Sequence, residues 1–140
     1  MNIIKQIDVS TNDREIINIT PQVKKIINDC KLEMGLVNLS ILHTSASLFV
    51  QENASRDVLS DIIEFLNTLV PVNPKYRHNS EGPDDMPAHI KTLLTNTNIS
   101  LSVRNNEILL GMWQGIFLCE HRRIKRNRTV IVHLLGGTDF

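Results

Sequence analysis

The chain has 140 residues, with 15 basic and 15 acidic side chains, so its formal net charge at neutral pH is zero. This length suffices for the core of one domain, and we expect a single domain over residues 1–140. The balanced charge argues against a nucleic-acid binder and against a membrane-surface binder. No apolar run is as long as a membrane span, and the N-terminus lacks the apolar segment of a secretory signal, which predicts a cytoplasmic protein.

The first half of the chain contains predicted strands and two predicted helices. Short apolar strands over residues 3–9 and 16–19 precede a helix that begins at Thr20 and Pro21 and is stopped by Gly35. The segment LVNLSIL alternates apolar and polar residues, as a half-buried strand does, and SLFVQ continues that strand or pairs with it. A second helix is predicted over residues 54–68, with an apolar stripe on one side that includes Phe65.

The second half begins with a polar loop and ends in strands. A short helix is predicted over residues 87–94, with Asp84, Asp85 or Met86 as its cap. Apolar runs at 99–103, 108–110, 113–120 and 129–135 then predict four strands, and the basic segment HRRIKRNR before the last one is interpreted as a hairpin tip. The lone tryptophan, Trp113, is expected to anchor the core or a subunit contact. These elements predict an α+β fold with mostly antiparallel sheets and helices packed on one face.

Three histidines lie in segments that are typical of a binding site. His78 and His89 bracket the loop YRHNSEGPDDMPAH, and His89 falls in the first turn of the short helix, where the helix dipole favours a neutral imidazole. His43 continues an apolar strand face and precedes small hydroxyl residues, including Ser45, that leave room for a ligand. Three histidines and an open position suit a divalent metal ion. The alternatives are a core role for His43 and a local hydrogen bond for His89.

Several charged or amide side chains are open to two interpretations. Glu120 shares an apolar strand face, so it is either paired with a cation or serves as a general acid–base or metal ligand. Arg128 belongs to a basic segment that is either solvated or binds phosphate through its arginine forks. Glu52 or Asn53 can cap the second helix. The sequence has no phosphate-binding glycine loop, zinc-finger spacing or nucleophile elbow.

Taken together, three segments and a histidine resemble the YjbQ-like family of small proteins, described as secondary thiamine-phosphate synthases. The segments are HTSASLFVQEN, DDMPAHIK and LLGMWQGIFLCEHRR, and the histidine is His78. The resemblance extends from about Gly35 to Gly136. It implies a sandwich-like α+β subunit, a homotrimer, and a polar pocket between subunits. One departure is Met112, which replaces the threonine of the family's GTWQ box and removes a hydroxyl there.

The resemblance also implies an activity and its residues. The implied enzyme couples a pyrimidine methyl diphosphate to a thiazole phosphate and releases pyrophosphate. The expected residues are His43, Glu52 and Glu120 for catalysis; Ser45, Asn53, Gln114 and Arg128 for binding the substrate or its phosphate; and His43, His78 and His89 for a divalent metal, zinc or magnesium. Two alternatives remain: a metal-dependent hydrolase of a small phosphorylated metabolite, and a non-catalytic trimeric module that binds a metal or a small anion.

Overall fold

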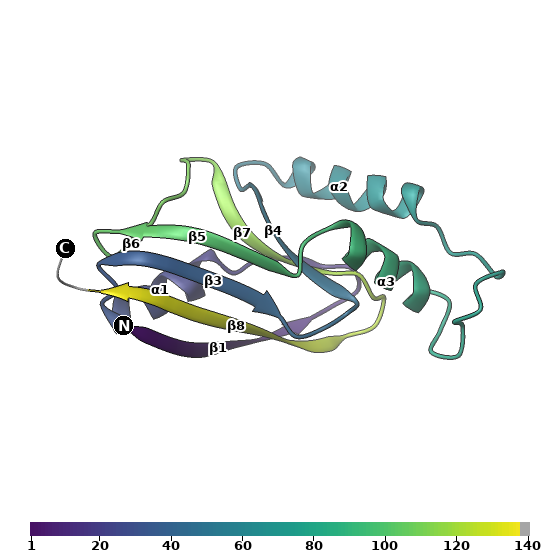
Figure 1. Cartoon of the computed structure of the whole chain (residues 1–140). Coiled ribbons are helices and arrows are strands. Elements are labelled where there is room, and N and C mark those ends of the chain that lie inside the picture. The colour runs from purple at the N-terminus through teal and green to yellow at the C-terminus, as the bar shows by residue number, and fades with distance from the viewer. Residues whose placement is uncertain (138–140) are drawn as a thin grey trace.

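The structure, a computed structural model, describes residues 1–137 and contains two antiparallel sheets and three helices (Figure 1). The elements are β1 (Asn2–Thr11), β2 (Ile16–Asn18), α1 (Thr20–Cys30), β3 (Met34–Ile41), β4 (Ala46–Glu52), α2 (Arg56–Leu69), α3 (Asp85–Leu94), β5 (Asn98–Arg104), β6 (Glu107–Ile108), β7 (Gln114–Glu120) and β8 (Arg126–Gly137). One sheet has the order β1-β8-β3-β5-β6 and the other the order β2-β7-β4, with antiparallel pairing throughout. The predicted α+β class is confirmed.

The two sheets and α1 share one apolar core. Leu48 of β4 and Leu118 of β7 are direct cross-strand partners, and both belong to the buried cluster that includes Leu39 of β3. Val23 and Ile27 lie one helical turn apart on α1 and are fully buried in the same cluster. Each such side chain contributes about 1.5–3 kcal/mol when it leaves water. The buried side chains of the strands and those of α1 therefore pack into a single core.

The first helix forms as predicted at its start but not at its end. Pro21 lies in its first turn, and the helix ends at Cys30 because Lys31 adopts a left-handed conformation with φ of 56°. Gly35, predicted to stop the helix, instead lies in β3 opposite Gly136 of β8. A Cβ atom at Gly35 would lie 1.9 Å from the carbonyl oxygen of Leu135. The glycine is therefore required by the close approach of the two strands.

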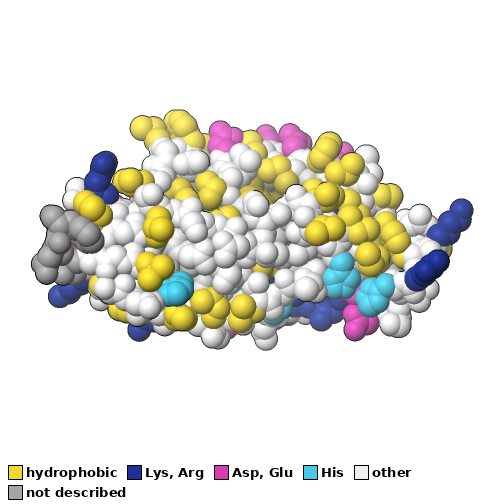
Figure 2. Space-filling model, in the orientation of Figure 1, with side chains coloured by type: hydrophobic (Ala, Val, Ile, Leu, Met, Phe, Trp, Pro, Cys, Tyr) yellow, Lys and Arg dark blue, Asp and Glu magenta, His cyan; other side chains and the backbone are white. Residues whose placement is uncertain are grey.

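The second helix and the tryptophan are exposed. No residue of α2 is buried, and its Phe65 is 64% exposed although it belongs to the predicted apolar stripe. Trp113 is 61% exposed, so it does not anchor the core of this chain. Figure 2 shows hydrophobic side chains gathered at the surface over α2 and α3. Within residues 1–137, no helix is long and apolar enough to cross a membrane.

The basic segment after β7 is not a hairpin tip, because β7 and β8 belong to different sheets. The chain crosses here from one sheet to the other. Arg122 and Arg128 are only 3% and 4% exposed. Asp84 and Asp85, from a distant segment, pair with Arg122, and Glu120 at the end of β7 pairs with Arg128. The short helix also begins earlier than predicted, at Asp85. The segment after β7 and the start of α3 therefore lie together, and their basic and acidic side chains form ion pairs there.

Candidate metal centre

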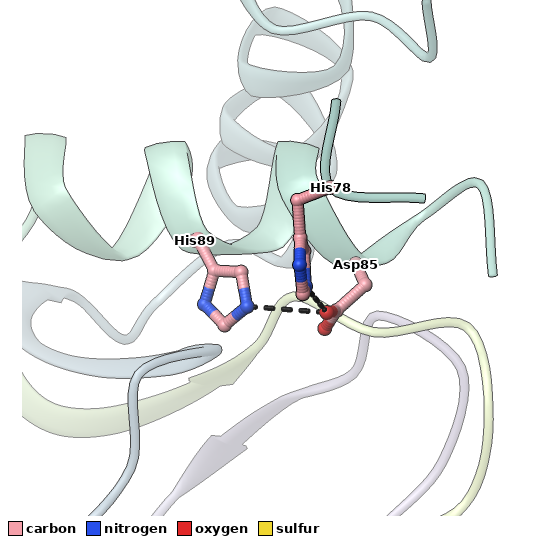
Figure 3. A group of neighbouring side chains, drawn as sticks. All are labelled: His78, Asp85 and His89. Atoms are coloured by element: carbon pink, nitrogen blue, oxygen red, sulfur yellow. Dashed lines mark hydrogen bonds and ion pairs between the residues drawn. The ribbon is translucent and has the colours of Figure 1, made fainter. Parts of the chain in front are cut away.

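Two histidines and one aspartate converge beside α3 (Figure 3). Asp85 and His89 are one helical turn apart on α3, and His78 comes from the loop before it. The Nε2 atoms of His78 and His89 lie 2.6 and 3.1 Å from the same atom, Asp85 Oδ2. The three side chains each offer one ligand atom, and these atoms all lie within 4.8 Å of one another. Figure 2 shows histidine side chains gathered at the surface, at the end of the molecule that carries α3.

The hydrogen bonds of His89 define which ring nitrogen faces the cluster as an electron donor. Its Nδ1 lies 2.8 Å from the carbonyl oxygen of Thr44, which can only accept, so Nδ1 carries a proton. A neutral ring then presents the Nε2 lone pair to the Asp85 carboxylate. Two electron-rich atoms in contact repel each other unless a proton or a cation lies between them. An N–H bond to a backbone carbonyl is also how proteins orient histidines that bind metals.

Asp85 is held as a carboxylate by its neighbours. It is almost fully buried, and its Oδ1 accepts a hydrogen bond of 2.7 Å from Arg122 Nη1. Burial pushes the pKa of Asp85 upward, but hydrogen bonding by His78 and the positive charge of Arg122 hold that pKa below its usual value. Arg122 is fixed in turn by Asp84, which accepts from its Nε at 2.9 Å. One carboxylate oxygen is thus anchored and the other faces the two histidines.

A pocket of about 430 Å³ adjoins His89. The lining residues are His43, Thr44, Met86, His89, Ile90, Thr92, Leu93, Thr95 and Thr97. Threonine hydroxyls and apolar side chains make up most of the lining. Within residues 1–137, no Lys or Arg lines this pocket. The volume is in the range of small-molecule sites. The pocket can therefore hold a small molecule next to the histidine–aspartate cluster.

His43 lines this pocket but does not join the cluster of three. Its Nε2 accepts the backbone N–H of Thr129 at 2.8 Å, so its proton is on Nδ1 in the neutral ring. Burial and then the charge of Arg128 lower the pKa of His43, which keeps the ring neutral near pH 7. Of the three expected metal ligands, the structure brings His78 and His89 together with Asp85. Asp85 was missed because it was interpreted as a helix cap.

Glu120, Arg128 and Ser45 form a buried network. Arg128 donates from Nε to Glu120 Oε1 at 2.7 Å and from Nη2 to Oε2 at 2.5 Å, and Nη2 also reaches Ser45 Oγ at 2.9 Å. Thr11 Oγ1 and the backbone N–H of Arg122 donate to the same carboxylate. Burial pushes the pKa of Glu120 upward, but these hydrogen bonds hold it below its usual value. An ionised carboxylate with both oxygens occupied by hydrogen bonds fits a structural role for Glu120.

Glu52, Asn53 and Gln114 lie at the opposite end of the three-stranded sheet. Along β4, the residue paired with Glu120 is Ala46 and the residue paired with Gln114 is Glu52. Six steps of strand separate these pairs, which corresponds to about 20 Å. Asn53 Nδ2 donates to the carbonyl oxygen of Gln114 at 3.3 Å. Within one chain, the expected site residues therefore form two separate groups.

The sequence profile of the YjbQ-like UPF0047 proteins matches residues 5–137. The chain belongs to this family. A UPF0047 protein of Synechocystis sp. is 42% identical over 129 residues, which cover 91% of this chain and 88% of the relative. The YjbQ protein of Escherichia coli O157:H7 is 38% identical over 133 residues, covering 94% and 96%. The family expected from the sequence motifs is thereby confirmed.

Solved structures of similar proteins share the fold of this chain. A conserved hypothetical protein of Thermus thermophilus superposes with a TM-score of 0.83 at 36% identity, covering 94% of this chain and 99% of that one. A YjbQ/UPF0047 protein of Clostridium acetobutylicum gives a TM-score of 0.83 at 32% identity, covering 95% and 99%. The fold of this chain is thus shared by both of these solved structures.

Proposed function

We propose that His78, Asp85 and His89 bind one divalent metal ion and that the protein acts on a small molecule in the adjoining pocket. The observation that carries this proposal is the contact of both Nε2 atoms with the same carboxylate oxygen. Two imidazoles and one carboxylate are the donor set of several zinc hydrolases, which keep further positions open. Magnesium prefers oxygen ligands and retains its waters. Of the two metals expected from the sequence, this donor set favours zinc.

The residues around that ion would each have a separate role. A bound divalent metal supplies a Lewis acid that polarises a phosphoryl or carbonyl oxygen and acidifies water. Asp85 contributes the negative charge, and the Thr44 carbonyl and Arg122 orient His89 and Asp85. The Nδ1–H of His43 is a neutral donor at the wall of the pocket. This arrangement supports hydrolysis of a small phosphorylated metabolite in the cytoplasm.

The coupling reaction implied by the family resemblance is the second candidate. It would require the pocket to hold a diphosphate and a second phosphate, whose charges need several cationic partners. The lining side chains within residues 1–137 supply none, and Arg128 is engaged by Glu120. The pocket therefore favours a substrate with one phosphate. Product analysis separates the two reactions, because coupling yields pyrophosphate and a joined product whereas hydrolysis yields free phosphate from one substrate.

We also propose the homotrimer that the resemblance implies, with the pocket completed by a neighbouring subunit. Exposed apolar side chains on α2 and before β7, including Phe65 and Trp113, offer surface for such contacts. In a trimer, Glu52 and Gln114 of one subunit would reach the pocket of another, which accounts for their distance from His43 in one chain. Native mass measurement tests the assembly. A monomer at micromolar concentration would contradict it.

The catalytic proposal is tested with zinc-loaded protein and a panel of phosphomonoesters. Wild type is expected to release free phosphate, and His89→Ala is expected to lose at least about a hundredfold in kcat/KM because a metal ligand is gone. The matched control is His133→Ala, since His133 lies on β8 and hydrogen-bonds Asn2 instead. Metal binding without turnover of any substrate would favour the non-catalytic binding module.

A further inference from the structure

A second polar cavity lies on the far side of α3 from the candidate metal centre. Its volume is about 50 Å³, and Pro87 and Lys91 of α3 line it together with Asn67 of α2 and the segment 70–72. His89 and Lys91 are two positions apart on the helix, which turns their side chains about 200° from each other. Helix α3 thus presents the candidate ligand His89 on one side and Lys91 on the other. The cavity has room for a small ion.

The cavity has an excess of positive charge. Lys91, Arg14 and Arg123 line it, and Asp84 is the acidic residue on its wall. The Oδ2 atom of Asp84 already accepts from Arg122 Nε and from the backbone N–H of Arg123, each at 2.9 Å. This carboxylate is therefore already engaged by other donors, and the three cationic side chains of the lining outnumber it. A site of this kind concentrates anions.

Lys91 carries the strongest indication of a ligand. It is 5% exposed, and its Nζ donates to Asn67 Oδ1 at 2.5 Å, which uses one of three donors. Among the ion pairs of residues 1–137, none involves Lys91. A buried ammonium without a carboxylate partner is costly. An anion in the cavity would accept the remaining hydrogen bonds and balance the charge.

The backbone holds Arg14 over this cavity. Arg14 has a left-handed φ of 45°, a backbone conformation that residues other than glycine rarely adopt. Its backbone N–H donates to the Arg122 carbonyl oxygen at 2.9 Å. Its Nε pairs with the exposed Asp13 at 2.8 Å, so the terminal guanidinium nitrogens remain for a ligand. Arg123 is exposed at the same cavity. The two arginines therefore form a solvent-accessible mouth above the buried lysine.

We propose that this cavity binds a small phosphate-type oxyanion, with Lys91 as the buried point charge and Arg14 and Arg123 at the mouth. Arginine forks match the oxygens of phosphate two at a time, and a lysine ammonium adds charge without a fixed direction. The site is separate from the candidate metal centre and does not depend on a metal ion. It gives the protein a second binding site whose ligand is an anion.

The test is calorimetric titration of inorganic phosphate into metal-free protein at constant ionic strength. Wild type is expected to bind phosphate, and Lys91→Met to bind it at least about tenfold more weakly. Methionine fills the space of the lysine stem and removes a buried charge, so this variant is expected to fold. Lys75→Met, which alters an exposed lysine in the loop before α3, is the matched control and should bind as wild type does.

Two further variants make the outcome decisive. Arg123→Gln changes an exposed residue and should weaken phosphate binding several-fold without affecting folding. His78→Ala/His89→Ala should bind phosphate as wild type does, because the cavity lies on the other side of α3. Absence of phosphate binding by wild type, equal binding by Lys91→Met, or loss of binding in the double histidine variant would each overturn the proposal.

Discussion

His121 is a buried histidine whose protonation opposes folding. Its Nε2 lies 2.9 Å from Ser47 Oγ and its Nδ1 lies 3.7 Å from Cys119 Sγ, and the residue is 3% exposed. Burial, followed by the positive charge of Lys91, lowers the pKa of His121 from 6.5 to about 4. The folded protein therefore holds a neutral imidazole at pH values where the unfolded chain is already protonated.

The sign and size of the pH effect follow from these two values. Because the unfolded chain binds the proton more tightly, the free energy of unfolding falls as the pH falls. The contribution of His121 is fully present above pH 6.5 and is lost as the pH approaches about 4. Between about pH 7 and about pH 5, this single residue should remove about 2 kcal/mol from the free energy of unfolding.

Urea unfolding of wild type and His121→Gln at these two pH values isolates the effect. Glutamine retains a hydrogen-bonding group for Ser47 but does not titrate, and the other titrating groups are common to both proteins. The loss of stability between the two pH values should be smaller in the variant by about 2 kcal/mol. Equal losses in the two proteins would refute the assignment of a neutral, buried His121.

Three substitutions test the fold. Glu120→Gln should cost about 3–5 kcal/mol in chemical denaturation because it leaves Arg128 buried without its partner; lost activity at unchanged stability would instead indicate a chemical role. Gly35→Ala should cost more than about 2 kcal/mol, since its Cβ would meet the Leu135 carbonyl; wild-type stability would refute the close approach. Ser55→Ala removes the side-chain cap of α2 and should cost about 1 kcal/mol in thermal unfolding.

Local patterns predicted most elements but not how the strands pair. The alternation of apolar and polar residues predicted β3, β5 and β8, because every second side chain of each strand faces the shared core. The same patterns do not specify partners, so the neighbours β7 and β8 were taken for a hairpin although they lie in different sheets. Arg122 seemed solvated in a run of basic residues because its carboxylate partners, Asp84 and Asp85, come from a distant segment.

The candidate site was predictable only in part for the same reason. His78 and His89 were expected to lie in one site, and they do lie together, since the loop before α3 and the second turn of α3 hold them there. Asp85 escaped because the predicted helix began after it, which hid its four-residue spacing to His89. Gln114 matches the family motif, yet it lies at the end of β7 opposite Glu120. No local sequence pattern predicts this distance between Gln114 and the histidines.

Metal content measured together with native mass tests the central claim most directly. Wild type would be incubated with zinc, desalted and compared with His78→Ala/His89→Ala, with Asp85→Asn and with the control His133→Ala. The account predicts about one zinc per chain in wild type and control, and none in the ligand variants, at unchanged native mass and circular dichroism. A wild type that cannot be loaded, or ligand variants that retain zinc, would contradict the proposed metal centre.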